Sequence, residues 1–139
     1  MNKAERIEFV ISEFRKADIT IDENQADKFV RLCDFMVEYN ENVNLTSITE
    51  FSEVVVKHFV DSVLPFTMVD VPQGSSFIDV GTGAGFPAIP LLICRPDLNG
   101  TLCDSLNKRC VYLEKACELI GVKSEIIHAR SEELGRKRR

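Results

Sequence analysis

Residues 77–87 read Phe77-Ile78-Asp79-Val80-Gly81-Thr82-Gly83-Ala84-Gly85-Phe86-Pro87. A short apolar run leads into three glycines at alternate positions, and a proline follows them. The run predicts a buried strand, and the proline is typical of the first turn of a helix. Glycine permits a sharp turn and the close approach of a ligand, and a helix start supplies free N–H groups. This segment therefore predicts a ligand-binding strand–loop–helix unit, with a tight turn that binds no ligand as the alternative.

After this segment, predicted helices alternate with predicted strands along the chain. Gly121 is placed where glycine commonly ends a helix. Alternation of strands with helices indicates βαβ units and a parallel sheet. We therefore expect an α/β, Rossmann-like fold. The helices are predicted at residues 87–94 and 106–120, and the further strands at residues 101–103 and 124–128.

The first 70 residues predict helices. An i, i+3, i+4, i+7 spacing favours an amphipathic helix over residues 3–17. A capping box at Thr20-Ile21-Asp22-Glu23 predicts the start of a second helix, which ends near Tyr39. The buried positions of these two helices are expected to be Ile7, Val10, Ile11, Phe14, Phe29, Cys33, Met36 and Val37.

The same pattern divides the chain into two parts. A polar loop is predicted over residues 40–49 and a third helical region over residues 50–68, before the turn at Pro72-Gln73-Gly74. We therefore expect a helical N-terminal extension over residues 1–70 and the N-terminal half of an α/β domain over residues 71–139.

Composition restricts the class of protein. The chain is 45% hydrophobic and 28% charged with a net charge of −5, which is typical of a soluble globular protein. It has no apolar stretch of the ~20 residues that a membrane span requires and no apolar core of a signal peptide near Met1, so we expect a cytoplasmic protein without a membrane partner. The acidic residues 1–70 argue against a general nucleic-acid coat. The basic run Arg136-Lys137-Arg138-Arg139 is either a solvated helix surface or an RNA contact.

Cysteine spacing gives no sign of a metal site. The five cysteines include no C-x-x-C pair, which argues against zinc, and we expect no metal. Cys103, Cys110 and Cys117 are spaced by seven, which is a packing period on a helix. Buried thiols are therefore expected, rather than a redox role.

The spacing of the glycines bears on the class of ligand. Dinucleotide enzymes favour G-x-G-x-x-G, and the third position of that pattern here is Phe86. The observed G-x-G-x-G spacing suits a ligand without a pyrophosphate, and S-adenosylmethionine is such a ligand. An oxidoreductase with a nicotinamide cofactor is the less favoured alternative.

Asp104 ends the second predicted strand, next to the glycine loop. A carboxylate at this place accepts hydrogen bonds from ribose hydroxyls in adenosine-cofactor folds. Asp104 is also placed to cap the helix that follows, and the two roles are compatible. The glycine loop and this acid together predict a nucleoside-cofactor site.

Four motifs occur in a fixed order along the chain, and together they closely resemble the ribosomal RNA small subunit methyltransferase G family, also called glucose-inhibited division protein B. The resemblance covers essentially the whole chain. The combination is specific, although each motif alone is not. The motifs are Asn44-Leu45-Thr46-Ser47-Ile48, Lys57-His58-Phe59-Val60-Asp61-Ser62, Asp79 to Pro87, and Asp104-Ser105-Leu106-Asn107-Lys108-Arg109.

The resemblance implies a bacterial enzyme that uses S-adenosylmethionine to methylate N7 of one guanine in 16S rRNA. Its implied fold is a class I methyltransferase sheet of seven strands with a helical N-terminal extension. Asp79 is expected to orient the loop, to approach the methionine ammonium through water, or only to stabilise the turn. The cofactor positions implied by the family motifs are Gly81, Gly83, Gly85, Phe86, Asp104, Ser131 and Glu132.

The family pattern extends beyond this sequence. It continues into a fourth strand and an arginine that closes over cofactor and substrate, and neither has a counterpart here. We therefore expect a truncated form that holds the first three strands and leaves one edge of the first strand unpaired. Partial disorder or self-association would follow from that edge, whereas the complete protein is expected to be a monomer.

Four cationic or titratable residues are candidates for RNA binding. Lys57 and His58 share a helical stretch with Asp61, and they either form a surface pair or line the cofactor or RNA pocket. Lys108 and Arg109 begin a helix beside the cofactor edge, where they either contact phosphate or remain solvated.

The implied reaction is direct methyl transfer to guanine N7, which carries a lone pair and no proton. We therefore predict no catalytic acid or base, and a reaction that depends on alignment and on exclusion of water. The 16S rRNA or the small ribosomal subunit is the expected partner. A methyltransferase of the same fold acting on a small molecule or a protein is one alternative, and a non-catalytic cofactor-binding fragment is another.

Overall fold

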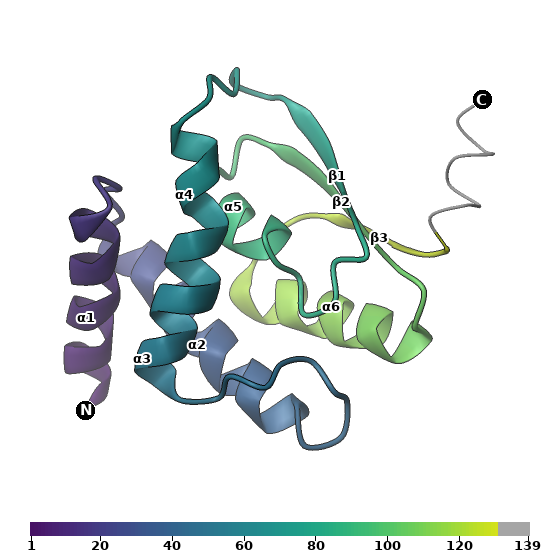
Figure 1. Ribbon diagram of the computed structural model, residues 1–139, viewed down its shortest axis with the longest axis horizontal. Helices are drawn as coiled ribbons and strands as arrows, with labels where there is room; N and C mark the ends of the chain where they lie inside the picture. The colour runs from purple at the N-terminus through teal and green to yellow at the C-terminus, as the bar shows by residue number, and fades with distance from the viewer. Residues whose placement is uncertain (131–139) are drawn as a thin grey trace.

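The computed structural model describes residues 1–130. Three parallel strands form one sheet in the order β1-β2-β3, which confirms the α/β, Rossmann-like class (Figure 1). The predicted sites at Ser131 and Glu132 and the basic run at residues 136–139 lie outside the described residues. The strands are β1 (Ser76–Val80), β2 (Asn99–Asp104) and β3 (Glu125–His128), and they alternate with the helices α5 (Ala88–Cys94) and α6 (Asn107–Ile120).

The carboxyl ends of the three strands lie at the same edge of the sheet because the strands pair in parallel. Ile78 pairs with Thr101 in the β1–β2 ladder, and Cys103 pairs with Ile127 in the β2–β3 ladder. This register brings the segments after β1 and β2 to the same edge of the sheet. Within residues 1–130, β1 pairs only with β2, so its other edge has no backbone partner, as predicted.

The N-terminal part is helical, as predicted. The third helical region is continuous with a wider π turn at its centre, which the apolar spacing did not predict. Val54, Val55, Phe59 and Val63 are all buried there. The helices are α1 (Lys3–Lys16), α2 (Glu23–Tyr39), α3 (Phe51–Val54), the π segment η1 (Val55–Val60) and α4 (Asp61–Thr67).

The predicted capping box at residues 20–23 was wrong. Asp22, not Thr20, caps α2: its carboxylate accepts from Gln25 N at 2.8 Å, and Gln25 Oε1 accepts from Asp22 N at 2.9 Å. Ile21, the residue before the cap, is buried, and this fixes the start of the helix two residues later than predicted. A carboxylate at the cap also faces the positive end of the helix dipole.

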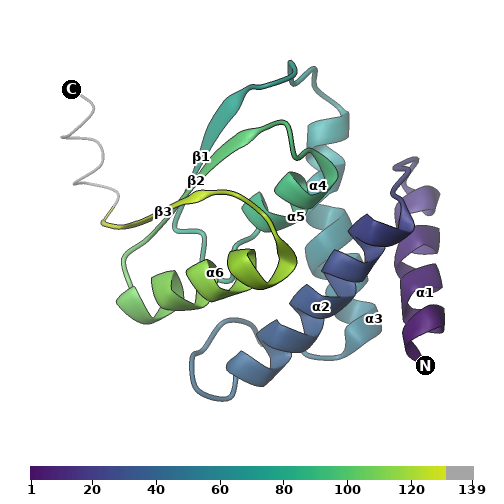
Figure 2. The same ribbon diagram turned by 180° about the vertical axis from the view of Figure 1, so that it is seen from behind.

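One hydrophobic core joins the helices to the sheet. The helices α5 and α6 cover one face of the sheet (Figures 1 and 2). Phe77, Leu102 and Ile126, one from each strand, belong to this core. The rings of Phe14 and Phe59 both pack on Phe29, with centroids 4.9 Å apart in each pair. Because this core includes residues on both sides of position 70, the division into parts at residues 1–70 and 71–139 stays a prediction.

The opposite face of the sheet carries a smaller apolar cluster. Ile78, Cys103, Ile127 and Ala129 pack together there. Four of the five cysteines are buried, Cys94 is half-buried, and no disulfide joins them. Burial raises the pKa of the Cys33 and Cys94 thiols to about 12, so both are protonated at neutral pH, in keeping with a packing role.

Candidate functional site

The glycine loop leaves the carboxyl end of β1 and is fixed to β2. The N–H groups of Gly81 and Thr82 both donate to Cys103 O, at 2.9 and 3.0 Å. All three loop glycines have positive φ, and Gly85 has the largest value at 95°. A Cβ on Gly85 would lie 2.4 Å from Ile89 Cδ1, so this position requires glycine for packing as well as for conformation. The predicted strand–loop–helix unit is therefore present.

The Asp79 carboxylate joins the glycine loop to the start of α5 by hydrogen bonds. Its Oδ2 accepts from Thr82 Oγ1 at 2.8 Å and from Ala88 N at 3.3 Å, at the start of α5. Burial raises the pKa of Asp79, while these two hydrogen bonds act in the opposite direction. Of the three expected roles, the structure places Asp79 where it orients the loop and stabilises the turn.

Asp104 connects the loop to α6. It is only 2% exposed, and its Oδ2 accepts from Gly83 N at 2.9 Å. Its Oδ1 accepts from Leu106 N at 2.9 Å. Leu106 is itself the N-cap residue of α6 and, among residues 1–130, no side chain caps this helix, so the predicted capping by Asp104 was wrong, and its carboxylate instead holds the turn that leads into α6. Each carboxylate oxygen of Asp104 keeps a second lone pair. A ribose hydroxyl that binds Oδ2 therefore either shares this oxygen with Gly83 N or displaces the Gly83 hydrogen bond.

An aromatic stack forms the side of the loop that faces the helical extension. The rings of His58 and Phe86 lie 4.6 Å apart at an interplanar angle of 19°, and Phe59 packs edge-on against Phe86 at 6.0 Å. His58 Nε2 lies 2.8 Å from Thr46 Oγ1. In the described part of the chain, the ring bonds Thr46 rather than Asp61, the partner that i, i+3 spacing suggested. His58 therefore belongs to the wall of the glycine-loop site.

Acidification is expected to reduce stability through His58. Burial lowers the pKa of His58 from 6.5, and the nearby Asp61 only partly offsets this effect. Because the unfolded imidazole then binds a proton more readily than the folded one, the free energy of unfolding falls as the pH drops from 6.5 through the lowered pKa. The contribution is fully present above pH 6.5 and is lost below the lowered pKa. Denaturant titrations on both sides of it are expected to show a smaller loss in His58→Phe than in the wild type, and equal losses would contradict this role.

The other three candidate RNA contacts lie in different surroundings. Lys57 is exposed and pairs with Glu53 Oε2 at 3.1 Å, and Lys108 is exposed in the first turn of α6. Arg109 turns inward: its Nη2 donates to Asn44 O at 3.3 Å, and its Nη1 lies 3.8 Å from Asp104 Oδ1. The structure therefore brings His58 and Arg109 to the glycine-loop site and leaves the two lysines on the surface.

Two further residues of this site were not predicted, and both belong to the polar loop after α2. Thr46 carries the hydrogen bond to His58, and Asn40 organises the loop through its side-chain amide. The sequence feature that could have identified Asn40 is an asparagine at the end of a predicted helix, directly before a polar stretch. Asparagine side chains at such places readily form hydrogen bonds with nearby backbone groups.

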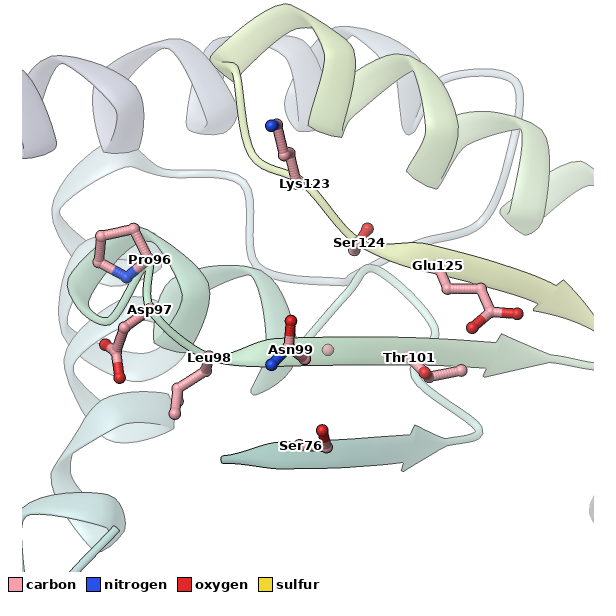
Figure 3. Close-up of a pocket in the computed structure, with 10 residues that line it drawn as sticks. Ser76, Pro96, Asp97, Leu98, Asn99, Thr101, Lys123, Ser124 and Glu125 are labelled. Atoms are coloured by element: carbon pink, nitrogen blue, oxygen red, sulfur yellow. The ribbon is translucent and has the colours of Figure 1, made fainter. Parts of the chain in front are cut away.

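A separate hollow of about 540 Å³ lies at the amino ends of the strands, opposite the glycine loop (Figure 3). The polar residues around it come from the beginnings of the three strands and the segments before β2 and β3. Its position separates it from the site built by the glycine loop and Asp104. Among its lining residues are Ser76, Asp97, Asn99, Thr101, Lys123 and Glu125.

Residues 1–130 contain neither a membrane-spanning helix nor a cluster of metal ligands. None of the helices described is long and apolar enough to cross a bilayer. These residues also contain no group of three or more His, Cys, Asp or Glu side chains arranged to hold a metal ion.

Comparison with known proteins agrees with the motif order. The chain is 41% identical over 125 residues to ribosomal RNA small subunit methyltransferase G of Desulforamulus reducens, covering 89% of this chain and 52% of that protein. It is 42% identical over 133 residues to the Bacillus subtilis protein of the same name, covering 95% and 56%. For the Clostridium perfringens protein of that name, the identity is 44% over 117 residues, covering 84% and 49%.

The chain thus spans about half the length of the curated relatives it matches. A family model described as rRNA small subunit methyltransferase G (GidB) matches residues 25–139, which is most of the chain. The resemblance drawn from the four sequence motifs is therefore confirmed. This chain belongs to the rRNA small subunit methyltransferase G family.

Proposed function

We propose that this chain carries the cofactor-binding part of an S-adenosylmethionine-dependent methyltransferase that methylates N7 of a guanine in 16S rRNA. The observation that supports this most strongly is the contact between the glycine loop and Asp104 at the carboxyl edge of adjacent parallel strands. Ligands of open α/β sheets bind at this edge. Such an enzyme acts on the small ribosomal subunit or its RNA, in the cytoplasm.

The residues present fit this cofactor. A Cβ built on Gly81 or Gly83 meets no atom within 4 Å, so the loop offers open space next to its backbone. Asp104 supplies a fixed carboxylate beside that space for a ribose. Phe86 supplies an apolar wall. We assign cofactor binding to these residues, with Gly85 completing the loop, Asp79 orienting it, and Ser131 and Glu132 near the adenine as the family motifs imply.

The chemistry places few demands on acid–base groups. Bound S-adenosylmethionine supplies a methyl group on a sulfonium sulfur. Guanine N7 has an in-plane lone pair and no proton at neutral pH, so the protein has no proton to remove. The chain's residues contribute alignment of the reacting groups and exclusion of water, which together account for a large share of such rate enhancements. Lys57 and Lys108, both exposed, are the proposed RNA phosphate contacts.

Calorimetric titration with S-adenosylmethionine tests the cofactor assignment. Phe86→Ala is expected to raise the dissociation constant about fivefold, because an aromatic contact contributes about 1 kcal/mol. Leu119→Ala, at an exposed position near the end of α6, is the matched control and is expected to bind as the wild type does. Binding of a nicotinamide dinucleotide in place of S-adenosylmethionine would contradict the proposal.

Methyl transfer tests the acceptor. Small ribosomal subunits that lack the modification are incubated with radiolabelled S-adenosylmethionine and either this chain or the Bacillus subtilis relative. Label on guanine N7 of 16S rRNA supports the proposal. Label on protein or on a small molecule, with none on the RNA, would favour a different acceptor for the same fold.

A further inference from the structure

The polar loop at residues 40–48 is built around one side chain. Asn40 Oδ1 accepts from Leu45 N at 2.8 Å and from Thr46 N at 3.0 Å, and its Nδ2 donates to Thr46 O at 3.0 Å. Ile48 N donates to Thr46 Oγ1 at 3.0 Å. These four bonds give a surface loop a defined shape, with Thr46 fixed through both its backbone and its hydroxyl.

This loop reaches the first side of the glycine-loop site through Thr46. Its hydroxyl is 2.8 Å from His58 Nε2, and the His58 ring stacks on Phe86. Ser62 Oγ also donates to His58 O, within the same helical region. Phe86 N bonds Thr82 O inside the glycine loop, so a displacement of the stack is transmitted to the loop backbone.

The same loop reaches the second side through Asn44. Its carbonyl accepts from Arg109 Nη2 at 3.3 Å, and Arg109 Nη1 lies 3.8 Å from Asp104 Oδ1. Asp104 in turn accepts from Gly83 N. Figures 1 and 2 both show the segment between α2 and α3 passing beside α6, where this bridge forms.

We propose that residues 40–48 position the glycine loop from both sides. Thr46 and His58 are positioning residues for Phe86, and Asn44 and Arg109 are positioning residues for Asp104. The effect on cofactor affinity rests on the function proposed above, whereas the effect on the loop itself does not. Holding a binding constellation through supporting contacts of this kind lowers the ordering cost of binding.

This assignment differs from a role in binding RNA. His58 is half-buried, one face of its ring lies on Phe86, and its Nε2 is engaged by Thr46. Arg109 is committed to a carbonyl and lies near a carboxylate of the same chain. An RNA phosphate would have to displace these contacts. At the exposed Lys57 it would replace only a surface ion pair with Glu53, and Lys108 is exposed at the start of α6.

Amide hydrogen exchange of the glycine loop, measured on the whole chain without cofactor, tests the proposal. Thr46→Val keeps the branched shape and removes the hydroxyl, and His58→Leu removes the stacked ring. Each is expected to speed exchange at Gly85 and Phe86 about fivefold, which corresponds to the loss of about one net hydrogen bond. Glu53→Gln, on an exposed part of the same helical region, is the control and is expected to change nothing there.

A double-mutant cycle separates positioning from a general loss of stability. His58→Phe keeps the stack but has no hydrogen bond to give, so Thr46→Val in that background is expected to leave loop exchange unchanged. His58→Phe itself is expected to speed loop exchange about as much as Thr46→Val does, because each variant loses the same hydrogen bond and keeps a ring-sized or branched side chain in place. Unchanged loop exchange in Thr46→Val and His58→Leu would overturn the proposal, as would an equal rise across α2 and the sheet.

The dissociation constant for S-adenosylmethionine is the second measurement on the same variants. We expect it to rise about fivefold in Thr46→Val and His58→Leu and to stay unchanged in Glu53→Gln. Faster loop exchange in a chain whose wild type binds no S-adenosylmethionine would support the positioning role while contradicting the cofactor assignment. An unchanged affinity in variants with a loosened loop would overturn the link between positioning and binding.

Discussion

Replacing Gly85 with alanine is expected to lower the free energy of unfolding by about 3 kcal/mol, the sum of positive-φ strain and overpacking. The residue has φ of 95°, and a Cβ there would lie 2.4 Å from Ile89 Cδ1 and 3.0 Å from Leu113 Cδ2. Both neighbours are fully buried, so neither side chain has space to withdraw. Urea denaturation measures the difference.

Gly74→Ala is the matched control for this substitution. Gly74 has a similar φ of 79°, but a Cβ there meets no atom within 4 Å. Its cost is therefore expected to be about 1 kcal/mol, which is backbone strain alone. Equal costs at the two positions would show that the contact with Ile89 and Leu113 has no part in the effect.

Replacing Asp104 with alanine is expected to cost about 3 kcal/mol, because two N–H groups lose their acceptor in a buried setting. The groups are those of Gly83 and Leu106, each 2.9 Å from a carboxylate oxygen. Asp104→Asn keeps one oxygen as an acceptor and is expected to lose roughly half as much. Chemical denaturation of both variants measures the ranking.

Asp70→Ala is the control for Asp104→Ala, since Asp70 is exposed and its replacement is expected to change stability by less than about 0.5 kcal/mol. An effect at Asp104 as small as that would contradict the bracing role. The result also bears on cofactor measurements, because a loss of affinity in Asp104→Ala combines a loosened loop with a missing ribose acceptor. Phe86→Ala also removes the stack with His58, so its affinity is compared with that of His58→Leu, which removes the same stack and keeps the Phe86 ring.

Local patterns predicted most of the secondary structure. Turn and helix-end signals depend on only a few neighbouring residues. Such signals are the alternate glycines, the proline after them and Gly121, and the observed helices and strands begin and end near them. The capping prediction failed because two acceptable cap residues, Thr20 and Asp22, lie two positions apart. The burial of Ile21 decides between them, and burial is a property of the folded chain.

The candidate site was predictable only in part, for a related reason. The glycine loop and Asp104 were predicted from their places at the ends of successive strands. The bridge from Asn44 to Arg109 joins residues 65 positions apart, and the stack of His58 on Phe86 depends on how the helical extension packs. The sequence predicted that Arg109 either contacts phosphate or stays solvated, and it gave no sign that the guanidinium donates to Asn44 O.

The order of the strands in the sheet is the same as their order in the chain. Among the strands of residues 1–130, each one therefore adds to an edge that was made earlier in synthesis. As the polypeptide leaves the ribosome, β1 and β2 can pair, with α5 as the connection between them, before β3 has emerged. The hydrogen bond between Gly83 and Asp104 joins only residues of this first unit, so the candidate cofactor site can start to form before most of α6 has emerged.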